Sequence, residues 1–168
     1  MKLKITFFIV LAALLGLTIS MCGSGSDSQK TADASVTSSP DNTGIKWYGY
    51  DDGMALGKKE GKKILINFYA DWCTYCKKMD RETFSNKNVA DYMNENFIPI
   101  KLNSDVEKQL SKEFRVNGLP TTFFMDQNGE KLLALPGYLD RTQFLACLEY
   151  VQSDSYRDMS FQQFMSKK

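Results

Sequence analysis

The sequence predicts an α/β domain in which helices flank a mixed β-sheet. Residues 64–70 form a short apolar run between charged residues, which is typical of a buried central strand. Residues 97–102 form a second such run, and helical patterns separate the two. An Asn-Gly pair then lies between apolar runs at 121–125 and 131–135, which predicts a β-hairpin. A strand–helix–strand unit followed by a hairpin and a helix gives a sheet with both parallel and antiparallel neighbours.

The expected helices are marked by caps and by the spacing of apolar residues. Asp140 caps the last helix of the domain, whose apolar face includes Phe144 and Leu148. Further helices are predicted over residues 51–59, from Cys73 to a break near Phe84, over residues 89–96, and from a cap at Asp105 through Phe114.

Three stretches outside this domain differ from it in composition. Residues 1–22 start with two lysines and continue as an apolar run, the pattern of an export signal rather than of a membrane span of about 20 residues. Residues 23–44 are rich in Ser, Thr, Gly and Asp without apolar periodicity, so we expect a flexible linker. The domain is predicted over residues 45–152. Residues 153–168 form a tail, with a docked short helix, a dimer contact and a fraying end as open alternatives.

Cys22 closes the apolar run and is followed at once by Gly23-Ser24-Gly25-Ser26. This pattern resembles a bacterial lipoprotein signal, which implies that Cys22 becomes the lipidated first residue of the mature chain. Met21 departs from the pattern, because a small residue usually precedes the cysteine. Ordinary cleavage nearby and an uncleaved signal anchor remain alternatives. All three place the domain outside the cytoplasm, in the periplasm or at the cell surface, where disulfides persist.

The composition excludes several classes of function. Lys and Arg total 21 and Asp and Glu total 20, so the chain lacks the basic excess of a nucleic-acid-binding protein. Histidine is absent, which removes Ser-His-Asp and Cys-His catalysis, His-ligated zinc or copper, and histidine pH switches. The chemistry must therefore come from cysteine, carboxylate, lysine or tyrosine.

Cys73 and Cys76 form a Cys-x-x-Cys motif where the predicted central strand passes into a helix. A structural zinc site needs four ligands, and only Cys147 and Cys22 remain to complete one. A purely structural disulfide is disfavoured, because closing so short a loop constrains the unfolded chain little. We therefore predict a redox-active pair that needs no metal and no other cofactor.

The position of each cysteine predicts its role in thiol–disulfide exchange. Cys73 meets the unpaired N–H groups and the positive dipole end of the helix, which lowers a thiol pKa from about 8.5 to roughly 3.5–7.5. Lys77 and Lys78 add positive potential one turn further on. Cys73 is thus the predicted nucleophile, which is exposed and forms a mixed disulfide with a partner. Cys76, shielded by the helix, is the predicted resolving cysteine.

Two separated motifs carry a resemblance to a known family. Residues 68–77 read FYADWCTYCK, and residues 118–121 read GLPT. In this order and spacing they resemble the thioredoxin superfamily, and in particular its periplasmic thioredoxin-like domains, such as the C-terminal domain of DsbD. The resemblance implies a thioredoxin fold and a cis peptide bond before Pro120. It also implies that the backbone of Leu119 pairs with a substrate strand and that Trp72 covers the rim of the site.

One position departs from the family's pattern. Thioredoxins carry a buried aspartate in the strand before the dithiol, and Asn67 stands there in this chain. Lys101 matches a lysine near that acid, so it is a candidate supporting residue, with a solvated lysine at a strand end as the alternative. Asp71 is interpreted as a helix-start carboxylate rather than an acid–base group. Cys147, on the apolar face of the last helix, is expected to be a buried and inert thiol.

Together these features favour an exported, membrane-attached thiol–disulfide oxidoreductase that reduces protein disulfides. Its expected partners are protein thiols and disulfides and a membrane thiol protein that donates electrons. Relatives that oxidise or isomerise disulfides carry a histidine between the cysteines, where this chain has Thr74 and Tyr75. A disulfide oxidase or isomerase, and a binding module without catalysis, remain alternatives. The intact cysteine pair argues against a pure binding module, and the missing histidine argues against copper delivery.

Overall fold

The computed structural model of the chain describes residues 43–168. The predicted signal segment over residues 1–22, with Cys22, and nearly all of the predicted linker lie outside these residues. Two residues at the end of that linker are described. Thr43 is buried, and the carbonyl of Gly44 accepts a hydrogen bond from Asn94 Nδ2 at 2.9 Å. The folded domain therefore includes at least these two residues before the predicted boundary.

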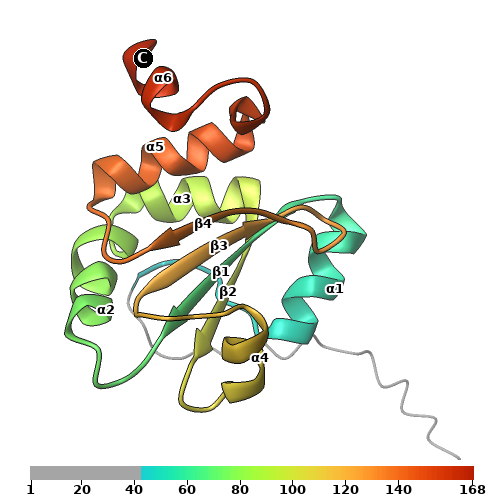
Figure 1. Cartoon of the computed structure of the whole chain (residues 1–168), viewed down its shortest axis with the longest axis vertical. Coiled ribbons are helices and arrows are strands. Elements are labelled where there is room, and N and C mark those ends of the chain that lie inside the picture. Colours follow the sequence, from blue (N-terminus) through green and yellow to red (C-terminus); the bar gives the residue numbers. More distant parts are fainter. Residues whose placement is uncertain (1–42) are drawn as a thin grey trace, which may run out of the picture. The chain divides into compact units, whose positions relative to one another are not determined.

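The sheet consists of four strands, β1 (Lys63–Tyr69), β2 (Phe97–Asn103), β3 (Thr121–Met125) and β4 (Lys131–Pro136). Their order across the sheet is β2-β1-β3-β4 (Figure 1). β1 pairs in parallel with β2 and antiparallel with β3, and β4 pairs antiparallel with β3. This arrangement confirms the predicted α/β class and its mixed sheet.

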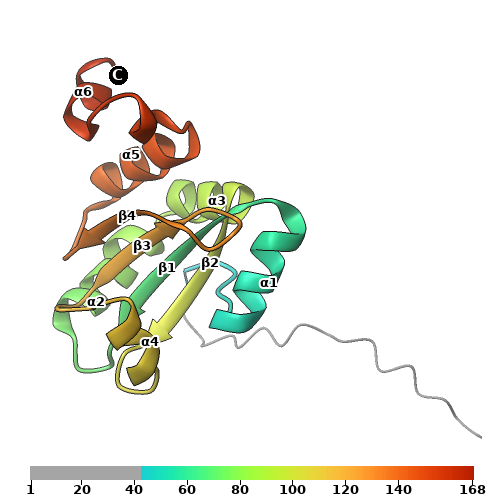
Figure 2. The ribbon, with the colours of Figure 1, turned by 45° about the vertical axis from the view of Figure 1, so that its right-hand side comes forward.

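The helical elements are α1 (Tyr50–Glu60), α2 (Thr74–Met79) with its π-helical continuation η1 (Asp80–Phe84), α3 (Lys87–Asn96), α4 (Lys108–Glu113), α5 (Arg141–Gln152), the 3₁₀ turn η2 (Ser155–Arg157) and α6 (Phe161–Ser166). α1 and α4 cover one face of the sheet, and α2, α3 and α5 cover the other (Figures 1 and 2). Because side chains alternate along a strand, Leu65 faces the α3 and α5 side, whereas Ile64 and Ile66 face α1 and α4. β1 is buried on both faces, which explains why residues 64–68 are apolar except at Asn67.

One local prediction was wrong, and the predicted hairpin is confirmed with a different turn geometry. Asp105 does not cap α4, because residues 104–106 form a turn and the helix starts at Lys108. In the hairpin, Gly129 has a φ of 89°, but Asn128 before it does not have a positive φ. The loop is longer than a two-residue turn. Asp126 Oδ1 closes it by accepting hydrogen bonds from the backbone N–H groups of Asn128 and Glu130, with 2.8 Å between nitrogen and oxygen in each.

Within the tail over residues 153–168, α6 (Phe161–Ser166) packs on α5 (Figure 1). The ring of Tyr150 in α5 lies 5.4 Å from that of Phe161 and 5.3 Å from that of Phe164. At the same end of the domain, Lys63 Nζ donates to the carbonyl of Val151 at 2.9 Å and forms an ion pair with Asp154 at 3.0 Å. The first residue of the central strand therefore holds the start of the tail.

α1 packs closely on β2 because it presents glycine to the sheet. A Cβ added at Gly53 would lie 2.4 Å from Cγ1 of Ile100, whose side chain is fully buried. We expect Gly53→Ala to lower the free energy of unfolding by about 1–2 kcal/mol, because overpacking outweighs the better helix propensity of alanine. Urea unfolding measures this change. Gly118→Ala is the matched control, since no atom lies within 4 Å of its added Cβ. An equal loss of stability in both variants would contradict this explanation.

Candidate active site

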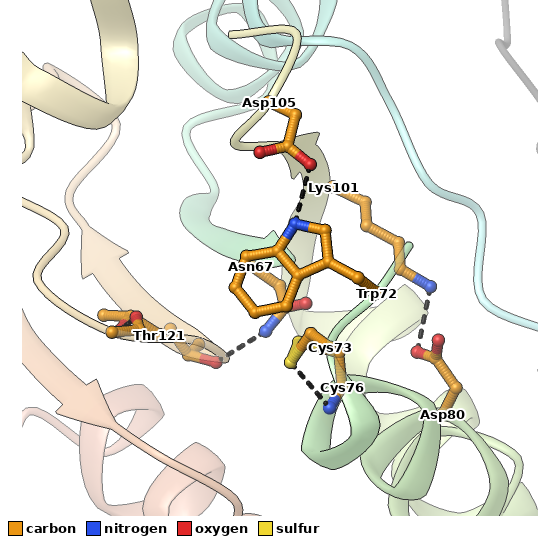
Figure 3. The surroundings of a disulfide bond; sticks show 10 residues. Asn67, Trp72, Cys73, Cys76, Asp80, Lys101, Asp105 and Thr121 are labelled. Carbon is orange, nitrogen blue, oxygen red and sulfur yellow. Dashed lines mark hydrogen bonds and ion pairs between the residues drawn. A yellow bond between two sulfur atoms is a disulfide. The ribbon is translucent and has the colours of Figure 1, made fainter. Parts of the chain in front are cut away.

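The dithiol lies where the chain leaves β1 and enters α2. Cys73 and Cys76 are joined by a disulfide, and their Cα atoms are 5.2 Å apart. Cys73 is the N-cap residue of α2. Its Sγ accepts a hydrogen bond from the backbone N–H of Cys76, with 3.1 Å between nitrogen and sulfur (Figure 3). One of the unpaired donors at the start of the helix therefore points at the Cys73 sulfur, as expected for the nucleophile.

The exposed fraction does not distinguish the two cysteines. Cys73 and Cys76 are each 4% exposed, and both pack against Ala70 with Tyr69 and Leu119 at the edge of the cluster. The prediction that the first cysteine is open and the second shielded therefore does not hold in this disulfide form. What separates them is the hydrogen bond from the helix backbone, which reaches the sulfur of Cys73.

The second predicted motif lies against the dithiol. The Leu119–Pro120 peptide bond is cis, as the resemblance implies. The side chain of Leu119 packs on the cluster that contains both cysteines. Thr121 Oγ1 donates to the carbonyl of Gly118 at 2.7 Å and closes the loop that carries this peptide bond. The fold thus brings together two motifs that are more than forty residues apart in the sequence.

Trp72 forms the rim of the site and is 69% exposed. Its indole Nε1 donates to Asp105 Oδ2 at 2.9 Å (Figure 3). Asp71 is also exposed, and its Oδ2 accepts a hydrogen bond from Asn103 Nδ2 at 3.2 Å. The two bonds connect the residues before the dithiol to the last residue of β2 and to the turn that follows it. Asp105 and Asn103 were not among the predicted site residues.

Asn67 is buried beneath the site at 2% exposure. Its Nδ2 donates to Thr122 Oγ1 on the neighbouring strand β3 at 3.0 Å. An amide held in this way takes up no proton. The β1–β2 register places Lys101 opposite Asn67, so the two positions that resemble the family's acid and lysine are indeed neighbours.

Lys101 is not a solvated lysine, because its side chain is only 9% exposed. Its Nζ forms an ion pair with Asp80 Oδ1 at 2.9 Å (Figure 3). The same Nζ lies 5.2 Å from the ring centroids of Trp47 and Tyr69. Asp80 was not predicted as a site residue, although its spacing is informative. It follows Cys76 by four residues, which places both side chains on one face of the helix.

The two lysines expected to add positive potential at the dithiol differ in their surroundings. Lys77 is exposed. Lys78 Nζ lies 4.4 Å from the ring centroid of Tyr138 and forms an ion pair with Glu82 Oε2 at 3.8 Å. Its charge therefore interacts with η1 and with the segment after β4. Within residues 43–168, no group of three or more Cys, Asp and Glu side chains is arranged to hold a metal ion.

The family model described as a thioredoxin-like domain matches residues 50–152. The chain belongs to the thioredoxin-like family. Together with the Cys73–Cys76 pair, this makes it a thiol–disulfide oxidoreductase with a thioredoxin fold.

Among curated relatives, the thiol:disulfide interchange protein DsbD of Actinobacillus pleuropneumoniae is 36% identical over 95 residues. The match covers 54% of this chain and 16% of that protein. DsbD of Haemophilus ducreyi is 37% identical over 94 residues, again with 16% of its length covered. The chain therefore spans about a sixth of the length of the curated relatives it matches.

Two solved structures have a similar fold. A thioredoxin from Thermus thermophilus superposes with a TM-score of 0.60 at 26% identity, covering 64% of this chain and 87% of that one. The C-terminal domain of Neisseria meningitidis DsbD, in its reduced form, superposes with a TM-score of 0.50 at 28% identity. That match covers 59% of this chain and 90% of the domain.

Cys147 is a free, buried thiol on α5, and burial raises its pKa from the ordinary value of 9.0 to about 11. We expect iodoacetamide at pH 8 to leave Cys147 unlabelled in the native protein, because its thiolate is absent at that pH. Peptide mapping checks this, and labelling after denaturation is the control.

The shift also gives the stability a pH dependence. The unfolded chain loses the Cys147 proton near pH 9 and the folded chain near pH 11, so this thiol lowers the free energy of unfolding as the pH rises through that window. In Cys147→Ala this contribution should be absent. Rapid labelling of native Cys147 at pH 8 would show that the thiol is accessible and contradict both expectations.

Proposed function

We propose that this protein is an extracytoplasmic oxidoreductase that reduces disulfide bonds in other proteins. Exchange through Cys73 is supported best by the hydrogen bond from the Cys76 backbone N–H to Cys73 Sγ. The reducing direction is supported by Thr74 and Tyr75, which place no charged group between the cysteines. A hydrogen bond to the charged form of a group favours that form, so the helix start stabilises a thiolate on Cys73. Because the thiolate is the attacking species, Cys73 is the nucleophile and Cys76 the resolving cysteine.

The reaction consists of two exchanges. The Cys73 thiolate attacks one sulfur of the substrate disulfide, so that a mixed disulfide forms and the substrate's other sulfur leaves as a thiolate. Cys76 then loses its proton and attacks the Cys73 sulfur, which releases the second substrate thiol. The two substrate thiolates take up one proton from Asp80 and one from water, so the substrate has gained two electrons and two protons. The protein is left with the Cys73–Cys76 disulfide that the structure shows. A dithiol of a membrane protein restores the reduced form.

Asp80 takes the proton that Cys76 gives up. Asn67 cannot do so, because an amide is too weak a base to accept this proton. Its Nδ2 donates to Thr122 Oγ1 instead. Asp80 lies four residues beyond Cys76 on the same face of the helix, and its backbone N–H donates to the Cys76 carbonyl. Lys101, at 2.9 Å, holds the carboxylate in place. The aspartate of the family's strand position is thus replaced by one on the helix.

The substrate is a polypeptide segment with apolar side chains. The described residues expose four large hydrophobic side chains, and three of them, Trp72, Tyr75 and Val106, belong to the dithiol motif or to the turn bonded to it. Each of the three is more than half exposed, with fractions of 62–73%. Leu119 contributes its backbone to the substrate strand beside Pro120, and Trp72 contributes apolar contact at the rim.

The domain works outside the cytoplasm, attached to a membrane by a lipid on Cys22 or by a signal anchor. The support for this is the N-terminal sequence together with the similarity to DsbD. In residues 43–168, no helix is long and apolar enough to cross a membrane. A coil over residues 23–42 would have a root-mean-square span of roughly 25 Å. The mass of the mature N-terminal peptide distinguishes lipidation from cleavage.

Substitution of each cysteine separates the two roles. We expect Cys73→Ser to abolish insulin reduction, since no nucleophile remains. Cys76→Ser should retain the first attack and accumulate mixed disulfides, which appear on non-reducing gels and can be identified by mass spectrometry. Cys147→Ser is the matched control and should keep full activity, because that thiol lies outside the site. If reduced wild-type protein were alkylated faster at Cys76 than at Cys73, the assigned roles would be wrong.

The direction of exchange depends on how strongly the protein stabilises the Cys73 thiolate. Strong oxidants have a thiol pKa near 3.5 and a potential of about −120 mV, whereas thioredoxin lies near pKa 7 and about −270 mV. Thr74 and Tyr75 bring no positive charge between the cysteines. We therefore expect a potential near the thioredoxin value, measured by equilibration with glutathione. Thr74→His is the comparison variant and should shift the potential upward. A wild-type value near −120 mV would instead support a disulfide oxidase.

A further inference from the structure

We infer that Trp47, in the segment over residues 43–48, is a positioning residue that acts on the dithiol through Lys101 and Asp80. This inference rests on the proposed function for the role of Asp80. The segment precedes residues 50–152, which match the family model, so the family comparison does not include it.

The segment is fixed against the domain on two sides. The backbone N–H of Tyr48 donates to the carbonyl of Pro99 at 2.9 Å, and the N–H of Lys101 donates to the carbonyl of Tyr48 at 3.2 Å. These bonds form a parallel bridge to β2, the strand that carries Lys101. On the other side, the N–H of Lys46 donates to Asn94 Oδ1 in α3 at 2.9 Å. Trp47 is therefore held in place by its neighbours on both sides.

The side chain of Trp47 forms one wall around the Lys101 ammonium group. The indole is 4% exposed and packs edge-on against Phe84, with ring centroids 5.2 Å apart. Lys101 Nζ lies 5.2 Å from the Trp47 ring and 5.2 Å from the ring of Tyr69, and Asp80 Oδ1 lies 2.9 Å away. Two aromatic faces and one carboxylate thus fix the position of a nearly buried cation.

Packing alone does not account for a tryptophan at this position. Its indole N–H is buried, and it has no hydrogen-bond partner in the described part of the chain. A buried unpaired donor costs free energy that a phenylalanine would avoid while still filling much of the space. Tryptophan, however, offers the strongest aromatic face to a cation. The indole therefore fits a role in holding Lys101 better than a role as core filler.

The effect on the dithiol has a definite sign. Among residues 43–168, the charged and titratable groups that contact the Lys101 ammonium group include Asp80 from η1 and Tyr69 from β1. If Lys101 is held less firmly, its positive charge compensates the negative charge of the Asp80 carboxylate less fully. The negative charge of the carboxylate then disfavours a thiolate at either sulfur of the dithiol, because Cys73 and Cys76 pack in one cluster. Weakening the Trp47–Lys101 contact should therefore make the dithiol less reactive at low pH.

The test is the pH profile of Cys73 alkylation in the reduced full chain, followed by peptide mapping. We expect Trp47→Phe to move the midpoint to higher pH and to slow alkylation below the midpoint about threefold. Lys101→Met should shift the profile in the same direction. Adding Trp47→Phe to Lys101→Met should then change nothing more, because Trp47 acts through Lys101. Ile45→Val is the matched control, since it removes one methyl group from the same buried segment and should leave the profile unchanged.

Incorporation of fluorinated tryptophan weakens the aromatic face without changing its shape. In a Trp72→Phe background Trp47 is the remaining tryptophan, because the chain has two. Fluorination should again raise the midpoint, and this measurement decides the matter if Trp47→Phe does not fold. A profile that fluorination leaves unchanged, or a shift of equal size in Ile45→Val, overturns the inference. Failure of the wild-type chain to reduce insulin would overturn the proposed function alone, since the alkylation profile needs no substrate.

Discussion

The burial of β1 is the constraint on which the rest of the structure depends. This strand lies between β2 and β3 and between two layers of helices, and Ile64, Leu65 and Ile66 have no exposed surface. Its position is therefore fixed on every side. The chain leaves this strand at Tyr69 and reaches Cys73 at the start of α2. The buried strand therefore restricts the position of the reactive sulfur. The Pro120 loop leads into β3, which is bonded to β1, and it lies beside the same cysteine.

The chemistry of the site is divided between the backbone and a partly buried ion pair. The backbone N–H of Cys76 acts on the first sulfur and requires only that the helix begin at Cys73. The pair between Lys101 and Asp80 lies on the side of the helix that carries Cys76, where the family's strand aspartate is missing. Because Lys101 has little access to water, its charge is screened less than that of an exposed lysine such as Lys77. Side chains from β1, η1 and the segment before α1 contact this ammonium group.

The sequence was sufficient for the fold and for the dithiol, because both depend on local patterns. An apolar run marks β1, and a Cys-x-x-Cys pair after such a strand marks the reactive helix start. The contacts of Asp80, Asp105 and Trp47 could not be predicted in this way, since each joins segments at least twenty residues apart. Asp105 shows why the local reading failed. An aspartate before a helical pattern looks like a cap, but its carboxylate pairs with the Trp72 indole instead. The exposure of the cysteines could not be predicted from the sequence either, because it depends on how the disulfide packs against Leu119.

The dithiol and the contacts of Lys63 with the end of α5 lie at opposite ends of β1. Lys63 is the first residue of the strand and holds the end of α5, whereas Cys73 follows the last residue. A strand of seven residues spans about 23 Å, so the tail is separated from the active site by roughly the length of the sheet. The C-terminus is consequently a suitable point for attaching a tag, a fusion partner or a solid support. A molecule fixed there would present its reactive end outward, free to meet large substrates.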